Sequence, residues 1–214
     1  MLKRYILTGA PGGGKTALAH ALRQRGYCVV EEAATDVITI QQAQGVEEPW
    51  QRTDFLESIT RLQRQRQIAP VRATVDTQIY DRSPLCTLAL ARHLRRPVPL
   101  LLTKEVTRLI NDQIYERSVF LVQPLGFITV TAARRISYQD SVYFHQVHAA
   151  VYLEHGFELV DVPAAPVAER AALVDQLITS TARWEGLVSS RCNAFWPLQF
   201  SSCSPSVPAR QARQ

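Results

Sequence analysis

The chain has 214 residues, 46% of them hydrophobic, and a mean hydropathy of −0.08. A chain of this length buries about 70% of its unfolded surface, so we expect one main domain. No window of about 20 apolar residues could span a bilayer, and the apolar run after Arg4 is too short for a signal peptide. We therefore expect a cytoplasmic protein without a membrane span.

The net charge of +5 comes largely from the C-terminal segment, residues 186–214, which contains three arginines and no acid. The first 185 residues are therefore not strongly basic. One basic run, "RLQRQRQ" at residues 61–67, fits either a solvated helix face or a surface for nucleic acid or anionic lipid. The solvated face is the favoured interpretation, and the binding surface is kept as a minor alternative.

Short apolar runs alternate along the chain with longer helical stretches, a pattern typical of a parallel sheet with crossover helices. Each apolar run is continuous, as expected for a strand covered on both faces. The sequence predicts five strands: Arg4–Thr8, Tyr27–Glu31, Gln78–Asp81, Val119–Val122 and Phe157–Val162. We therefore predict an α/β fold, a three-layer sandwich built on a parallel five-stranded sheet.

Helix-start and helix-stop signals lie between these strands. Ser83 and Pro84 form a favourable N-cap and first helical position, and Ser137 with Asp140 has the spacing of a capping box. The predicted helices are Gly14–Arg25, Arg52–Ile68, one starting at Ser83, one starting at Thr103, Ser137–His155 and Pro166–Trp184. Residues 1–185 form the predicted domain, and residues 186–214, rich in Ser and Pro, form a tail expected to be largely disordered.

The stretch "GAPGGGKT", residues 9–16, follows the first strand and opens the first helix. It is the full P-loop pattern, in which glycines let the backbone N–H groups approach phosphates and the helix N-terminus adds its positive dipole. Lys15 is expected to bind the β- and γ-phosphates and Thr16 to ligate Mg²⁺. We therefore predict ATP and Mg²⁺ as cofactors, with these nucleotide-binding residues: Gly9, Ala10, Pro11, Gly12, Gly13, Gly14, Lys15, Thr16 and Ala17.

Acidic and basic residues close the second and third predicted strands, at the sheet edge where ligands of such folds bind. Glu32 follows the second strand, and Asp81 with Arg82 ends the third. A carboxylate there can accept a proton from an attacking hydroxyl or hold Mg²⁺, so Glu32 and Asp81 are the candidate base and metal contact, in an order left open. For Glu31 and Glu32 a helix N-terminal pair is the structural alternative. Arg82 is a candidate for binding phosphate or acceptor.

The segments "GAPGGGKTALAHALRQRGYCVVEEAATDVI", "YDRSPLCTLALARHL" and "FELVDVPAAPVAERAALV" resemble the P-loop ATPase domain family that includes the kinase domain of bacterial NadR, a ribosylnicotinamide kinase. They are more distantly similar to deoxynucleoside and thymidylate kinases. The resemblance covers about residues 3 to 180. It implies that Glu32 is the acid closing strand two and that Asp81 and Arg82 are the acid–Arg pair closing strand three. Thr35 stands where the family often carries Arg.

The same resemblance implies that Arg134 and Arg135 are lid arginines. A short lid between the fourth strand and the capped helix, residues 123–136, would bring guanidinium groups over the phosphates and exclude water. A surface pair before a helix is the equally weighted alternative for these two arginines.

We expect a small-molecule kinase that transfers the γ-phosphoryl group of ATP to a hydroxyl of a nucleoside-like acceptor. The alternatives are an NTP-hydrolysing switch acting on a macromolecular or lipid partner, and a nucleotide-binding module without catalysis. An N-K-x-D tetrapeptide is absent, so a Ras-like GTPase is not favoured. Trp50, Tyr80 and Tyr138 are candidates for stacking on a ring, or core residues.

Overall fold

The computed structural model describes residues 2–126 and 137–191, with residues 181–191 described by backbone alone. The chain divides into two parts, Met1–Leu177 and Ile178–Gln214. The first part contains the sheet and its helices. Of the second part, the described residues continue the last helix, α7 (Val167–Arg191).

The sheet contains five parallel strands in the order β2-β3-β1-β4-β5. Their bounds are β1 Lys3–Thr8, β2 Cys28–Val30, β3 Thr77–Asp81, β4 Ser118–Val122 and β5 Glu158–Val162. The connection from β1 to β2 skips over β3, and the connection from β3 to β4 skips over β1. The strands are therefore added first on one side of β1 and then on the other, so the order of the sheet reverses beside β1. Ligands of open α/β sheets bind at the carboxyl ends of strands at such a point. The predicted α/β fold with a parallel five-stranded sheet is confirmed.

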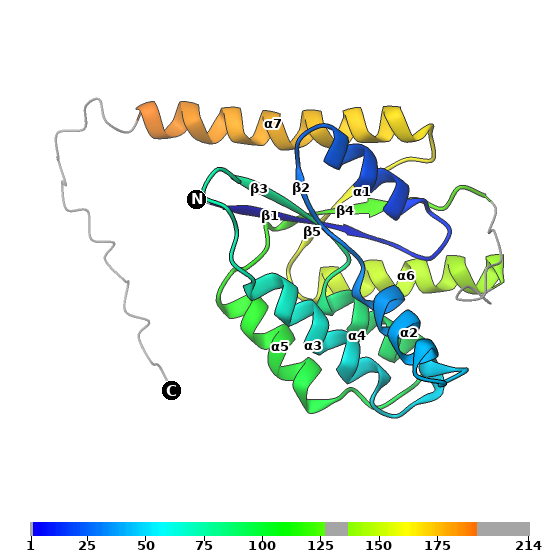
Figure 1. Cartoon of the computed structure of the whole chain (residues 1–214). Coiled ribbons are helices and arrows are strands. Elements are labelled where there is room, and N and C mark those ends of the chain that lie inside the picture. Colours follow the sequence, from blue (N-terminus) through cyan, green and yellow to red (C-terminus); the bar gives the residue numbers. More distant parts are fainter. Residues whose placement is uncertain (1, 127–136, 192–214) are drawn as a thin grey trace, which may run out of the picture. The chain divides into compact units, whose positions relative to one another are not determined.

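Helices cover both faces of this sheet, and they lie above and below the strands in Figure 1. α1 (Lys15–Gln24) and the first turns of α7 cover one face. The other face is covered by α4 (Pro84–His93), α5 (Leu100–Asn111) and α6 (Tyr138–Glu154), with α3 (Phe55–Ile68) packed against α4 and α5 and α2 (Ala33–Ala43) packed against α3. A 3-10 turn, η1 (Pro49–Gln51), precedes α3.

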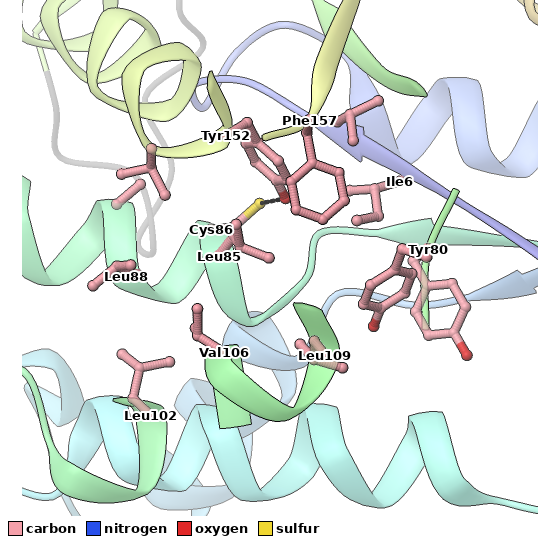
Figure 2. Close-up of a cluster of buried hydrophobic side chains, with 14 of the residues drawn as sticks. Ile6, Tyr80, Leu85, Cys86, Leu88, Leu102, Val106, Leu109, Tyr152 and Phe157 are labelled. Atoms are coloured by element: carbon pink, nitrogen blue, oxygen red, sulfur yellow. Dashed lines mark hydrogen bonds between the residues drawn. The ribbon is translucent and has the colours of Figure 1, made fainter. Parts of the chain in front are cut away.

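A cluster of buried apolar side chains joins α4, α5 and α6 to the sheet (Figure 2). Ile6 of β1 and Tyr80 of β3 point into it, and the rings of Tyr80 and Tyr115 form a T-shaped pair with their centroids 5.0 Å apart. The Tyr152 hydroxyl lies 2.7 Å from Ser83 Oγ and 3.2 Å from Cys86 Sγ, so this buried hydroxyl has polar partners inside the apolar cluster. The cluster fixes α4 and α6 against β1 and β3, next to the ends of those strands.

The predicted helix caps are present. Ser83 Oγ accepts a hydrogen bond from the Leu85 N–H, and Ser137 Oγ accepts one from the Asp140 N–H. α1 ends before Gly26, where the Tyr27 N–H reaches back to the Leu22 carbonyl as in a Schellman motif. Helix α2 was not predicted, and α5 begins at Leu100, before the predicted Thr103.

The last helix, α7, continues beyond the predicted end at Trp184 to Arg191. The rest of the predicted tail, residues 192–214, lies outside the described residues, and the predicted domain boundary at residue 185 stays a prediction. No helix in the described ranges is long and apolar enough to cross a membrane.

Candidate active site

The P-loop connects β1 to α1, and side-chain donors hold four of its carbonyl groups. Lys15 Nζ donates to the Ala10 carbonyl at 2.7 Å. The other three donors come from separate elements: Arg82 Nη1 to Gly9, Ser141 Oγ to Pro11 and Arg170 Nη1 to Gly13. These contacts fix the direction of the loop's peptide groups.

The N–H groups at the start of α1 are available to a ligand. Among the described residues, no backbone hydrogen bond uses the N–H groups of Gly14, Lys15 or Thr16. Free N–H groups at a helix N-terminus form an anion site, and phosphate is the anion that P-loops bind. The glycine pattern has a steric reason at Gly9, because a Cβ there would lie 2.7 Å from the Val122 carbonyl oxygen. The predicted phosphate-binding residues are thus brought together in a cradle that fits phosphate.

Lys15 is buried beneath this cradle. Burial, followed by the neighbouring charge of Arg82, lowers its pKa to about 7, although Asp81 and Glu32 act in the opposite direction. The ammonium group is therefore only partly charged near neutral pH. A phosphate placed beside it would raise its pKa again, so nucleotide binding and protonation of Lys15 are linked.

Asp81 ends β3, level with Leu7 of β1 in the sheet register. Its Oδ2 accepts a 2.9 Å hydrogen bond from Thr16 Oγ1, whereas its buried Oδ1 has no hydrogen-bond partner among the described residues. Burial and the charge of Glu32 raise the Asp81 pKa. A carboxylate and a hydroxyl beside a phosphate site match the donor set that Mg²⁺ uses, with water and phosphate oxygens completing the shell. These residues fit Mg²⁺; no larger cluster of His, Cys, Asp or Glu suited to a metal lies in the described part of the chain.

Glu32 forms an ion pair with Arg82 across the site. Its other carboxylate oxygen accepts a 2.8 Å hydrogen bond from Thr35 Oγ1. Burial alone would raise the Glu32 pKa, but Arg82, Thr35 and Lys15 outweigh it, and the pKa is lowered. Glu32 is therefore an ionised carboxylate at neutral pH. It occupies the N-cap position of α2 without capping it, which leaves the side chain facing the site.

Arg82 has a left-handed backbone conformation, φ 78°, which costs about 1 kcal/mol in a non-glycine residue. Its N–H still bonds to the Leu7 carbonyl, and its guanidinium reaches Glu32, the Gly9 carbonyl and His148. Burial opposes the charged form, yet Glu32 raises the Arg82 pKa overall. The strained turn aims the guanidinium into the site.

His148 of α6 is fully buried and links Arg82 to Thr8 of β1. Arg82 Nη1 only donates, so the His148 Nε2 atom 3.3 Å away must accept. The ring proton then lies on Nδ1, 3.3 Å from Thr8 Oγ1. Burial, Arg82 and Lys15 lower the His148 pKa well below its usual value. From the sequence alone, His148 is one of two histidines three residues apart on the helix that Ser137 caps, and neither its burial nor its contact with Arg82 is apparent.

A cavity of about 490 Å³ runs from the P-loop past the charged residues into an apolar chamber. Its phosphate end is lined by Pro11, Gly12, Gly14, Lys15 and Thr16, and its middle by Glu32, Thr35, Asp81, Arg82 and Asp140. The far end is mainly apolar and aromatic, lined by Ala34, Ile38, Trp50, Phe55, Ile59, Leu90, Leu94 and Phe144, together with Gln63, Cys86, Thr87 and His93.

The polar pair Gln63 and Thr87 lies inside this apolar chamber. Thr87 Oγ1 donates to Gln63 Oε1 at 2.9 Å, which orients the amide, and the Gln63 amide NH₂ donates none of the hydrogen bonds found between described residues. Of the three aromatic residues considered as candidates for stacking on a ring, Trp50 lines the cavity, whereas Tyr80 is in the core, the more common role, and Tyr138 is 45% exposed. Gln63 and Thr87 were missed because their spacing becomes meaningful only once α3 and α4 pack together.

Two groups of predicted residues remain. Arg134 and Arg135, with the rest of the expected lid from residue 127 to 136, lie outside the described residues. In the basic run, every arginine meets a carboxylate: Arg61 pairs with Glu57, Arg64 with Glu105 and Arg66 with Asp36. Each of these three arginines therefore has an acidic partner.

Comparisons with known proteins agree with this architecture. A family model described as an AAA domain matches residues 4–170. No curated protein sequence matches the chain. Among solved structures, deoxyadenosine kinase from M. mycoides is 16% identical with a TM-score of 0.52, over 83% of this chain and 99% of that one. NadR in complex with NR is 17% identical with a TM-score of 0.53, over 75% of this chain and 45% of that one. These likenesses show a shared kinase-like P-loop fold.

Proposed function

Because the chain belongs to the AAA domain family of P-loop proteins, we propose that it binds ATP with Mg²⁺ and transfers the γ-phosphoryl group to a hydroxyl of a small, ring-bearing acceptor such as a nucleoside. The observation that carries the proposal is the continuous cavity. It joins the phosphate cradle to an apolar chamber, with Glu32, Asp81 and Arg82 among the residues between them. An enzyme that only hydrolyses nucleotide needs no such chamber.

In this proposal the two carboxylates have different roles. Glu32 is ionised and faces the cavity, so it accepts the proton of the attacking hydroxyl while the oxygen–phosphorus bond forms and the bond to the leaving ADP oxygen breaks. Asp81, hydrogen-bonded to Thr16, holds Mg²⁺, which neutralises charge on the phosphates when bound. Lys15 supplies a further positive charge, and Arg82 keeps Glu32 in place.

The apolar chamber would hold the ring of the acceptor. Trp50, Phe55 and Phe144 offer aromatic surface, and the oriented Gln63 amide offers a hydrogen bond to a polar atom of the ring. The solved relatives support this class of acceptor to the extent that one is a deoxyadenosine kinase and the other binds NR.

The test is release of ADP from Mg-ATP with a panel of nucleosides that includes nicotinamide riboside. We expect one acceptor to raise turnover about 100-fold or more, and Lys15→Ala to abolish it. Gln63→Leu is expected to raise the KM for that acceptor about tenfold with the KM for ATP unchanged, because it removes only the ring contact. If ATP binds but no small molecule changes the turnover, the alternative of a nucleotide switch with a macromolecular partner replaces this proposal.

A further inference from the structure

Arg170 is a buried arginine in the first turn of α7, and its guanidinium lies against the P-loop. Only 4% of the residue is exposed. Its Nη1 donates a 2.7 Å hydrogen bond to the Gly13 carbonyl, and its Nη2 lies 2.9 Å from the position that a Cβ on Gly14 would occupy. Gly14, with φ 73°, is the N-cap of α1. The Arg170 guanidinium therefore lies behind the N-terminus of α1, which faces the phosphate site.

Unlike the guanidinium groups of Arg82 and Arg108, this buried guanidinium lacks a counter-charge. Arg82 pairs with Glu32, and Arg108 pairs with Glu105. No carboxylate in the described part of the chain pairs with Arg170, and its buried Nε has no hydrogen-bond partner there. A buried charge without a partner costs free energy, so an anion is needed to offset it. The Gly13–Gly14 backbone that Arg170 contacts borders the phosphate cradle, so a phosphate bound there would bring an anion close to this guanidinium.

We propose that Arg170 is a positioning residue for nucleotide binding: it holds the Gly13 peptide in the orientation that serves the phosphates, and their negative charge supplies its missing counter-charge. It acts through the P-loop backbone. The inference rests on the nucleotide-binding half of the proposed function and does not depend on which acceptor, if any, receives the phosphate.

A second tie between α7 and α1 provides a matched control. Asp175 of α7 accepts hydrogen bonds from Arg25 Nη1 at 2.9 Å and from the Tyr27 hydroxyl at 2.7 Å, near the end of α1 remote from the phosphates. Asp175→Asn weakens the same helix pair without touching the P-loop. It therefore separates a general loosening of α7 from the specific action of Arg170.

The experiment is calorimetric titration of the full chain with Mg-ADP, comparing wild type with Arg170→Met, Arg170→Lys and Asp175→Asn. We expect Arg170→Met to raise the Kd about tenfold or more, Arg170→Lys to recover much of this loss because it restores the charge, and Asp175→Asn to stay within about threefold of wild type. Without nucleotide, the Tm of Arg170→Met should not fall below that of wild type, since an uncompensated charge has been removed.

Equal affinities of wild type and Arg170→Met would overturn the proposal. So would equal losses in the methionine and lysine variants, or an equal loss in Asp175→Asn. Failure of the proposed function gives a different pattern, in which wild type binds Mg-ADP but transfers phosphate to no acceptor. In that case the Kd values of the four proteins for Mg-ADP can still be compared, and the proposal for Arg170 is still tested.

Discussion

Thr16 at the start of α1 and Asp81 at the end of β3 are joined by a 2.9 Å hydrogen bond from the Thr16 hydroxyl to Asp81 Oδ2. These residues are 65 positions apart, and they meet because β1 and β3 are neighbours in register, with Leu7 opposite Asp81. The contact places a carboxylate beside the phosphate cradle. It supports the proposal that Asp81 holds Mg²⁺.

Asp81→Asn should separate catalysis from stability. The amide still accepts from Thr16, and because burial already raises the Asp81 pKa, loss of the charge should not destabilise the nucleotide-free protein. Turnover should fall about 100-fold or more, and the Mg²⁺ concentration for half-maximal rate should rise about tenfold. Steady-state rates over a Mg²⁺ titration, with the Tm as control, check this. An unchanged Mg²⁺ dependence would remove Asp81 from the metal site.

Nucleotide affinity should depend on pH through Lys15. Its pKa is lowered to about 7, and phosphate favours the charged ammonium, so Mg-ADP affinity should fall as pH rises above about 7, by up to about tenfold per pH unit. Calorimetry in buffers of different ionisation enthalpy should detect proton uptake on binding. In Lys15→Arg the guanidinium stays charged, so both effects should disappear. Their persistence in that variant would assign the titration to another group.

Glu32→Gln should act mainly on the chemical step. Turnover with the acceptor should fall about 100-fold or more, while the Kd for Mg-ADP changes by less than about threefold. The free energy of unfolding should also fall by about 3 kcal/mol, because Arg82 loses its counter-charge. Thr35→Val keeps the carboxylate and removes one hydrogen bond to it, so its loss of turnover should be much smaller. Equal losses in the two variants would argue against Glu32 as the base.

The fold was largely predictable from local patterns. Each predicted strand agrees with an observed strand to within one residue at either end, Ser83 and Ser137 cap the helices they were expected to cap, and the P-loop lies between β1 and α1. Helix α2 was missed because its sequence is only weakly amphipathic and Glu32, at its N-cap, does not cap it by hydrogen bond. In that case tertiary packing against α3 decides the structure more than local propensity does.

The candidate site was predictable where it follows strand ends and hidden where it depends on packing. The P-loop pattern and the ends of the predicted strands pointed to four site residues, and all four line the same cavity: Lys15, Glu32, Asp81 and Arg82. In contrast, His148 and Arg170 are placed by the docking of α6 and α7 against the sheet. Nothing in the spacing of single charged residues on a helix distinguishes a buried contact from a solvated one.

His148 should make stability depend on pH. Its pKa in the folded protein lies well below the usual value of 6.5, so the unfolded chain binds the proton more readily. The contribution of His148 to the free energy of unfolding is therefore fully present above about pH 6.5. As pH falls below that value, the free energy of unfolding should decline by up to about 1.4 kcal/mol per pH unit. His148→Gln, which keeps an acceptor and a donor but does not titrate, should show a shallower decline in urea unfolding between about pH 6.5 and pH 5. Equal slopes would assign the acid sensitivity to other groups.

The most direct test of the central claim follows the phosphate itself. The full chain is incubated with Mg-ATP labelled at the γ-phosphate and with each nucleoside of the panel, and the products are separated. The account predicts that the label appears in a phosphomonoester of one acceptor and that Glu32→Gln suppresses this product. Label found only in inorganic phosphate, at the same rate with and without every acceptor, would contradict phosphotransfer and identify the protein as a nucleotide hydrolase.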